Sequence, residues 1–194
     1  NRLLISFFLI LSPLLIFSQN FTRQDSLRGS ITPQRAWWDL TYYHLDISVD
    51  PDNRFIKGTN TVQYKVLEGN DEMQIDLQEP LKITKITQDG NELNFRSEGY
   101  SHFIKLKKKQ IKDKIKSIKI HYEGNPKIAV NPPWDGGLTW TRDFNGKHFV
   151  ANSNQGIGAS IWWPNKDHMY DEVDSMLISV NVPKDLVNVS NGRL

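Results

Sequence analysis

The five histidines are the first residues to test for chemistry, because histidine is a common metal ligand and a common general base. They are His44, His102, His121, His148 and His168, and no two of them lie three or four residues apart. The sequence therefore offers no helical pair of metal ligands. It also lacks H-E-x-x-H, a phosphate-binding loop, G-x-S-x-G and a dinucleotide fingerprint. By spacing alone, the chain is not predicted to be an enzyme.

The composition excludes several other kinds of site. The 194 residues include no cysteine, which rules out disulfides, thiolate zinc ligands and a cysteine nucleophile. The formal net charge of +2 gives no reason to expect nucleic acid as a partner. Neither a metal site nor a catalytic residue is predicted within this chain.

Lysines and tryptophans are the remaining candidates for binding. Tryptophans on a β-sandwich can stack on sugars or peptides. Where two adjacent tryptophans lie on a strand, one of the pair is expected in the core. The lysines are either a solvated strand edge, which is the favoured interpretation, or a docking patch for a polyanion. The residues concerned are Trp37, Trp38, Trp134, Trp140, Trp162 and Trp163, and Lys105, Lys107, Lys108, Lys109, Lys112, Lys114, Lys116 and Lys119.

The elements that must position these side chains are strands. Apolar residues alternate with polar ones, as in Tyr43-His44-Leu45-Asp46-Ile47, which is typical of a half-buried strand. Asp89-Gly90 predicts a tight hairpin turn. No stretch is convincingly helical, so the sequence predicts an all-β fold, an antiparallel sandwich or saddle. Strands are expected at 43–49, 55–66, 73–77, 81–86, 115–122, 147–151, 160–163, 176–182 and 187–190.

The first residues predict export. Arg2 precedes an apolar run from Leu3 to Phe17, and Ser18 follows it. The run is too short for a membrane-spanning helix and fits a signal peptide over 1–18. Residues 19–36 are polar and aperiodic and are expected to be a linker or arm. The mature protein is expected in the periplasm, in the cell envelope or outside the cell, with no membrane span.

The last residues predict a sequence that is C-terminally truncated. Asn191-Gly192 is a favoured hairpin turn after the strand expected at 187–190. Only Arg193 and Leu194 follow it. We expect the returning strand to lie beyond this sequence.

Several of these segments occur in an order that is typical of one family. An apolar strand, an acidic turn, F-x-G and a second alternating strand are followed by L-x-I-x-x-I and by the strand 118–124. Over about 150 residues this order resembles the N-terminal domain of the aminopeptidase N and leukotriene hydrolase family of zinc metallopeptidases. The residues that carry the resemblance are Tyr43, Leu45, Ile47, Asp50, Phe55, Gly58, Val62, Tyr64, Val66, Leu81, Ile83 and Ile86.

The most specific match is the segment 154–167. The family has there a Gln or Glu, an alanine followed by arginine, two apolar residues, a proline and an aspartate. The resemblance implies that Gln155, with its neighbour Gly156, binds the free α-amino group of a peptide substrate. The alternative for Gln155 is a loop amide that caps a turn. Ser160 departs from the usual arginine, and Asn165 departs from a common cysteine. The matching residues are Gln155, Ala159, Trp162, Trp163, Pro164 and Asp167.

The resemblance assigns residues 37–194 to the β-saddle domain of an exported zinc aminopeptidase. The family's G-x-M-E-N and H-E-x-x-H segments are not in this chain. We therefore expect no cofactor here, zinc in the missing catalytic domain, and no hydrolysis by this chain alone. Its expected partners are that catalytic domain and the substrate N-terminus. Two alternatives remain. One is a free-standing secreted sandwich that binds glycan or protein through Trp134, Trp140 or the pair Trp162 and Trp163. The other is a family scaffold retained as a non-catalytic interaction module.

Overall fold

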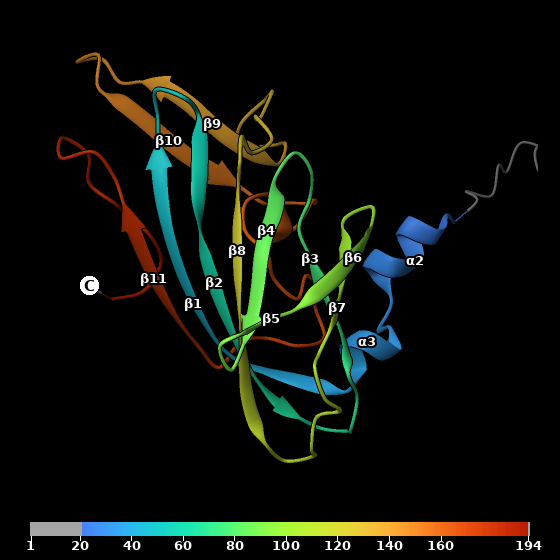
Figure 1. Ribbon diagram of the computed structural model, residues 1–194. Helices are drawn as coiled ribbons and strands as arrows, with labels where there is room; N and C mark the ends of the chain where they lie inside the picture. The colour runs from blue at the N-terminus through green and yellow to red at the C-terminus, as the bar shows by residue number, and fades with distance from the viewer. Residues whose placement is uncertain (1–20, 194) are drawn as a thin grey trace, which may run out of the picture.

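The computed structural model describes residues 21–193, in which three β-sheets form the framework of the protein (Figure 1). The six-stranded sheet has the order β11-β1-β2-β8-β4-β5, the three-stranded sheet β3-β7-β6, and the third is the hairpin β9-β10. The strands are β1 (Trp38–Asp50), β2 (Phe55–Val66), β3 (Glu72–Asp76), β4 (Lys82–Gln88), β5 (Asn91–Glu92), β6 (Asn94–Glu98), β7 (Ser101–Lys105), β8 (Ile115–Gly124), β9 (Gly137–Arg142), β10 (His148–Ser153) and β11 (Ser175–Asn181).

The all-β prediction is confirmed. The large sheet is nevertheless mixed, because β11 pairs with β1 in parallel while its other strands pair antiparallel. Asp89 and Gly90 form the expected turn, with Gln88 paired to Asn91 across it. The signal peptide predicted for residues 1–18 lies outside the described residues.

One apolar core lies between the two larger sheets. In β8, buried Ile118, Ile120 and Tyr122 alternate with the more exposed Lys119 and His121, as period two requires. The core residues of β8 and β1 belong to the same buried cluster as Met73, Ile75 and Ile104 of the small sheet. Each sheet therefore contributes one apolar face to the core.

The strand β3 and the two residues that continue it, Leu77 and Gln78, are buried on both faces, and their polar side is called the polar face of β3 below. Met73, Ile75 and Leu77 point into the apolar core. The intervening Gln74, Asp76 and Gln78 are also buried, which is unusual for polar side chains. A second layer must therefore cover the polar face of β3 and satisfy its hydrogen-bonding groups.

Part of that layer comes from residues 21–36, which were expected to be an aperiodic linker or arm. They contain the helices α2 (Arg23–Gly29) and α3 (Pro33–Ala36). A capping box between Thr22 and Asp25 starts α2, and proline occupies the first turn of α3. Both helices are too short to be stable alone, so their contacts with β3 hold them in place.

The central contact is a buried ion pair between Arg35 of α3 and Asp76 of β3. The Arg35 side chain is fully buried, and its guanidinium also donates to the backbone carbonyls of Leu27, Arg28 and Ser30. Gln74 and Ser101 donate to the other Asp76 oxygen at 3.0 and 3.1 Å. Arg35 thus connects the end of α2 and the start of α3 to the three-stranded sheet.

Three expectations about the chain were wrong. Residues 160–163 are not a strand; Ala159–Ile161 form a 3-10 turn, η2, between Gly158 at φ 82° and Pro164. Residues 187–190 are not a strand either, and the exposed Val187 and Val189 have no strand beside them. Trp37 and Trp38 are both buried, because Trp37 ends α3 and only Trp38 lies on β1.

We predict that Arg35→Met destabilises the fold by about 3–5 kcal/mol, because it leaves the Asp76 carboxylate buried without its counter-charge. Urea unfolding followed by tryptophan fluorescence measures the change. Arg23→Met removes an ion pair to Glu98 that is largely exposed on the arginine side, and serves as the matched control. Equal unfolding midpoints for the two variants would contradict a structural role for the buried pair.

Candidate functional site

The segment 154–158 folds into a tight turn that exposes Gln155. The carbonyl of Asn154 accepts hydrogen bonds from the backbone nitrogens of Ile157 and Gly158 at 3.2 and 3.0 Å. Gly156 and Gly158 have φ of 77° and 82°, a region that side chains other than glycine rarely adopt. The amide of Gln155 therefore stands at the tip of a turn whose shape is set by its own backbone.

Gln78, next to the end of β3, anchors this turn from below. Its backbone nitrogen donates to the carbonyl of Ser160 at 2.8 Å. Its Nε2 donates to the carbonyl of Ile157 at 2.6 Å and to Oγ of Ser160 at 2.9 Å. Ser160 Oγ in turn donates to Oδ2 of Asp167 at 2.5 Å. A chain of side-chain bonds thus joins the turn to the residues that follow it.

Asp76 anchors the other end of the segment. Its backbone pairs with that of Asn165 in both directions, at 2.8 and 3.0 Å, and its Oδ2 accepts from the nitrogen of Asp167 at 3.3 Å. Burial raises the pKa of Asp76, and the Arg35 guanidinium opposes that shift. The same carboxyl group therefore holds α3 and the candidate segment.

One hydrogen bond joins the turn to α2. Nη2 of Arg28 donates to the carbonyl of Gly156 at 3.3 Å. His168 contacts the carbonyl of Gly29 at 3.1 Å, so the segment touches α2 at both ends. The two helices and the candidate segment form one layer on the polar face of β3.

The chemistry that this arrangement can perform is binding. A glutamine amide both donates and accepts hydrogen bonds but carries no charge and does not titrate. Among residues 21–193, no three His, Cys, Asp or Glu side chains are grouped so that they could hold a metal ion. Gln155 and Gly156 are both exposed and available to a ligand.

The tryptophans do not gather into one exposed face. Across residues 21–193, Trp134 is the only exposed tryptophan, with 83% of its surface accessible. Trp140 and Trp162 are half-buried against the core. Trp163 is buried and packs edge-on against Tyr43, with ring centroids 4.9 Å apart. Trp134 is the one tryptophan whose ring is free to stack on a ligand.

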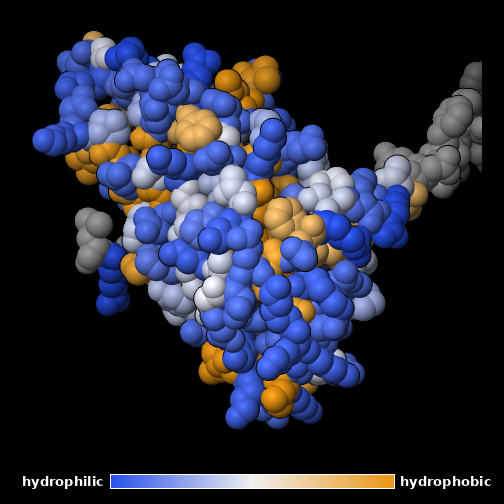
Figure 2. Space-filling model, viewed as in Figure 1, coloured by the Kyte–Doolittle hydropathy of each residue, from blue (hydrophilic) through white to orange (hydrophobic). Residues whose placement is uncertain are grey.

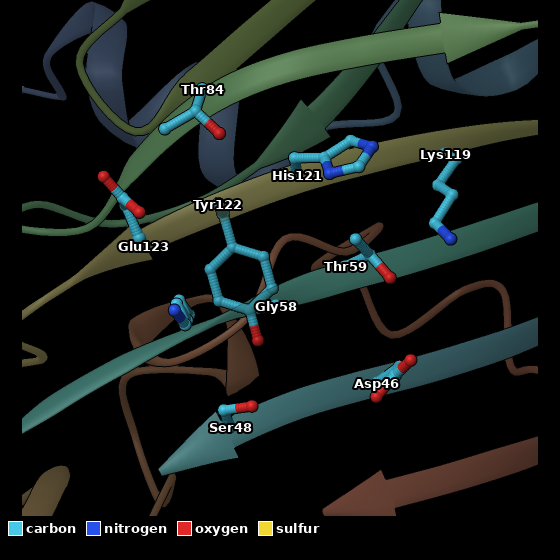
Figure 3. Close-up of a pocket in the computed structure, with 10 residues that line it drawn as sticks. Asp46, Ser48, Gly58, Thr59, Thr84, Lys119, His121, Tyr122 and Glu123 are labelled. Carbon is cyan, nitrogen blue, oxygen red and sulfur yellow. The ribbon is translucent and has the colours of Figure 1, made fainter. Parts of the chain in front are cut away.

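A shallow hollow of about 350 Å³ lies elsewhere, on the outer face of the large sheet (Figure 3). It spans β1, β2, β8 and β4 and is lined by both acidic and basic side chains, including Asp46, Lys119, His121 and Glu123. Burial lowers the pKa of His121, and the neighbouring Lys119 and Lys85 lower it further. Neither Gln155 nor a tryptophan lines this hollow, so it is separate from the candidate segment.

Lys166 is the one buried lysine of the segment. Its Nζ pairs with Asp171, donates to the carbonyl of Trp38 at 2.6 Å and lies 3.9 Å from the centre of the Trp38 ring. Burial lowers the pKa of Lys166 to about 8. The lysine fixes the segment to the start of β1 rather than facing a ligand.

The resemblance proposed Gln155 as a site residue, which stays a prediction, but the sequence did not single out the residues that hold its turn. Gln78, Asp76 and Arg35 were not singled out, because polar residues at alternate strand positions normally face water. One sequence pattern could have indicated them. Gln74, Asp76 and Gln78 alternate with apolar residues and so share one face, and Arg35 had no role assigned to it. Ser160, noted only as a departure from the family pattern, proves to be a link in the anchor.

Neither a protein-family model nor a curated protein matches the sequence. Solved structures do match. The chain is similar to an M1 zinc metallopeptidase from Deinococcus radiodurans, with a TM-score of 0.63 and 16% identity over 81% of this chain and 37% of that one. For yeast LTA4 hydrolase in complex with bestatin the TM-score is 0.65 and the identity 18%, over 87% and 26%.

Native leukotriene A4 hydrolase from Saccharomyces cerevisiae gives a TM-score of 0.61 and 20% identity, over 75% of this chain and 23% of that one. This chain therefore spans well under half the length of the structures it matches. The predicted resemblance is confirmed at the level of the fold: the chain has the β-fold of one part of these zinc metallopeptidases.

We predict that Gly158→Ala loosens the candidate turn. A Cβ at this position would lie 2.1 Å from Oδ2 of Asp167, the atom that holds Ser160, and would also strain the backbone. Gly156→Ala is the control, because it has the same sign of φ but open space around it. Hydrogen exchange at the Ile157 amide should be on the order of tenfold faster in Gly158→Ala than in the control. Equal rates would show that Asp167 does not fix the turn.

We also predict a pH dependence from Lys166. Its folded pKa is about 8 and its unfolded pKa is the ordinary 10.5, so between these values the unfolded state binds more protons. The free energy of unfolding therefore gains a contribution that rises with pH from about 8 by up to about 1.4 kcal/mol per unit. Urea unfolding at pH 7 to 9.5 should show this slope in the native chain and not in Lys166→Met. The same slope in both would contradict it.

Proposed function

We propose that this chain is the N-terminal, substrate-positioning domain of an exported zinc aminopeptidase that removes N-terminal residues from peptides. The observation that carries the proposal is the exposed Gln155, held on an anchored turn in a fold shared with zinc metallopeptidases. Export rests on the apolar run 3–17. Within residues 21–193, neither helix is long and apolar enough to cross a bilayer.

The ligands of the matched structures support a role in amine binding. A two-domain M1 zinc metallopeptidase variant is bound to L-arginine in one structure and to L-tryptophan in another. The Deinococcus radiodurans variant is bound to the substrate Tyr-Ser-Ala. All three ligands carry a free α-amino group next to different side chains. A group that recognises the amine itself would serve each of them.

Gln155 suits that task. Its Oε1 accepts a hydrogen bond from the substrate ammonium, and the missing side chain of Gly156 leaves room for the substrate backbone. Fixing the ammonium fixes which peptide bond is presented for cleavage, which is a positioning effect. Gln78 and Ser160 keep the turn in place while the amine binds.

The chemical step itself belongs elsewhere. Bound zinc would polarise the scissile carbonyl and activate water, but the side chains of residues 21–193 do not form a site that fits it. We propose that a catalytic domain, encoded beyond these 194 residues, holds the zinc and packs against this domain. This chain is then expected to bind a substrate amine only when the catalytic domain is present. By itself it is expected to be inactive.

The test uses the protein encoded by the complete reading frame. It should contain H-E-x-x-H with a downstream glutamate and hydrolyse aminoacyl arylamides, whereas residues 1–194 alone should not. Gln155→Ala should raise KM by about 10- to 100-fold, because it removes a hydrogen bond to a charged group. Asn152→Ala, an exposed amide on the neighbouring β10, is the control and should leave KM unchanged.

Two results would overturn the proposal at different points. A reading frame without the zinc motif would end the assignment as an aminopeptidase domain. An active enzyme in which Gln155→Ala and Asn152→Ala have the same KM would leave the activity intact and remove Gln155 from amine binding.

A further inference from the structure

A strand edge, the favoured interpretation of the sequence, accounts for few of the lysines between 105 and 119. Lys105 lies on β7 and Lys119 on β8, and both are paired to a strand on each side. Lys116 is paired to β2 alone. The remaining lysines lie in the connection between β7 and β8, where strand pairing is not at issue. Their accumulation needs another explanation.

We define the lysine tip as residues 106–115 together with the adjoining residues 67–70. It forms the end of the molecule opposite the β9-β10 hairpin (Figure 1). Of the lysines in the whole stretch, Lys105 and Lys116 pair with Asp71 and Asp89. Among the described residues, no acidic partner lies within ion-pair distance of the five lysines of the tip, which are Lys107, Lys108, Lys109, Lys112 and Lys114.

Aliphatic side chains stand among these lysines. Ile111 and Ile115 are 69% and 62% exposed, and Leu67 is also exposed. In Figure 2, orange hydrophobic atoms stand out among blue hydrophilic ones at this end of the molecule. Glu68 and Asp113 are the only acidic residues of the tip, so its charge is clearly positive. The surface combines exposed lysines with exposed aliphatic side chains.

The loop is built to keep Ile111 outward. Gln110 is buried, donates from its backbone to the carbonyl of Asn70 at 2.8 Å, and its side chain donates to the carbonyl of Lys108. Leu106 is buried as well, and its nitrogen donates to the carbonyl of Asp71. The space beneath the loop is therefore filled, and Ile111 begins a turn that is closed by a bond from the nitrogen of Lys114.

We propose that the lysine tip docks on the surface of an anionic lipid bilayer. Lysines attract the phosphate-rich headgroups, and aliphatic side chains gain free energy by entering the boundary with the acyl chains. Clusters of four to eight basic residues are typical of such surfaces. Nucleic acid fits less well, because the tip offers no aromatic ring for stacking and would leave its aliphatic side chains in water.

The proposal gives the domain a second surface besides the Gln155 turn. Docking through the tip would hold the protein at a membrane without a spanning helix. It does not depend on the proposed peptidase function, because none of the tip residues contacts the candidate turn in the hydrogen bonds that hold that turn.

The absence of cysteine allows a local test on the full chain. Ile111→Cys provides a single thiol for an environment-sensitive fluorophore, and Phe144→Cys provides a control label that is fully exposed in the β9-β10 turn. Vesicles of phosphatidylcholine that contain about 30% of the anionic lipid phosphatidylserine should shift the emission of the label at 111 to the blue. The label at 144 should not shift, and neither label should respond to pure phosphatidylcholine. Because the readout is local, the apolar run 3–17 does not confuse it.

The charge contribution is tested in the same labelled chain. Replacing Lys107, Lys108 and Lys109 by Gln should weaken vesicle binding on the order of 100-fold, at about fivefold per lysine. Replacing Lys57, Lys82 and Lys127 by Gln changes the net charge equally at the other end of the large sheet and should have little effect. A shift at 144 equal to that at 111, equal losses in both triple variants, or tight binding to a DNA oligonucleotide without vesicle binding would each overturn the proposal.

Discussion

The polar face of β3 is the constraint on which the rest of this half of the structure depends. Gln74, Asp76 and Gln78 are buried beneath a second layer, and buried polar groups destabilise a fold unless each finds a partner. Arg35 supplies the counter-charge for Asp76, and Ser160 and Ile157 supply acceptors for Gln78. Two short helices and an irregular segment therefore take fixed positions, because only there are the groups of β3 satisfied.

The two faces of β3 have different roles in the domain. The apolar face, through Met73 and Ile75, joins the small sheet to the core and contributes stability by burial alone. The polar face is held by hydrogen bonds and an ion pair, which are directional. It therefore fixes the positions of the helices and of the candidate segment more than it adds to the stability of the fold. The proposed binding of an amine would require that kind of specification, because Gln155 offers only one neutral amide, and its placement decides what it can reach.

The sequence predicted what depends on local pattern. Alternation predicted most strands, and Asp89-Gly90 predicted its turn. The resemblance pointed to Gln155, whose role stays a prediction. The sequence missed what depends on distant partners. The helices α2 and α3 have seven and four residues and exist through Arg35, whose partner lies 41 positions away. The parallel pairing of β11 with β1 joins residues more than a hundred positions apart, and no short-range signal announces it.

Ser160, where the resemblance leads one to expect arginine, joins Gln78 to Asp167 through its hydroxyl group. Gln78 Nε2 can only donate, so it occupies a lone pair of the Ser160 hydroxyl and leaves the hydroxyl proton for Asp167. The direction of the chain of bonds, from amide to hydroxyl to carboxylate, is thereby fixed. An arginine side chain has no acceptor and could not take the bond from Gln78. The Ser160 hydroxyl, which both accepts and donates, is therefore what couples Gln78 to the Asp167 carboxylate in this chain.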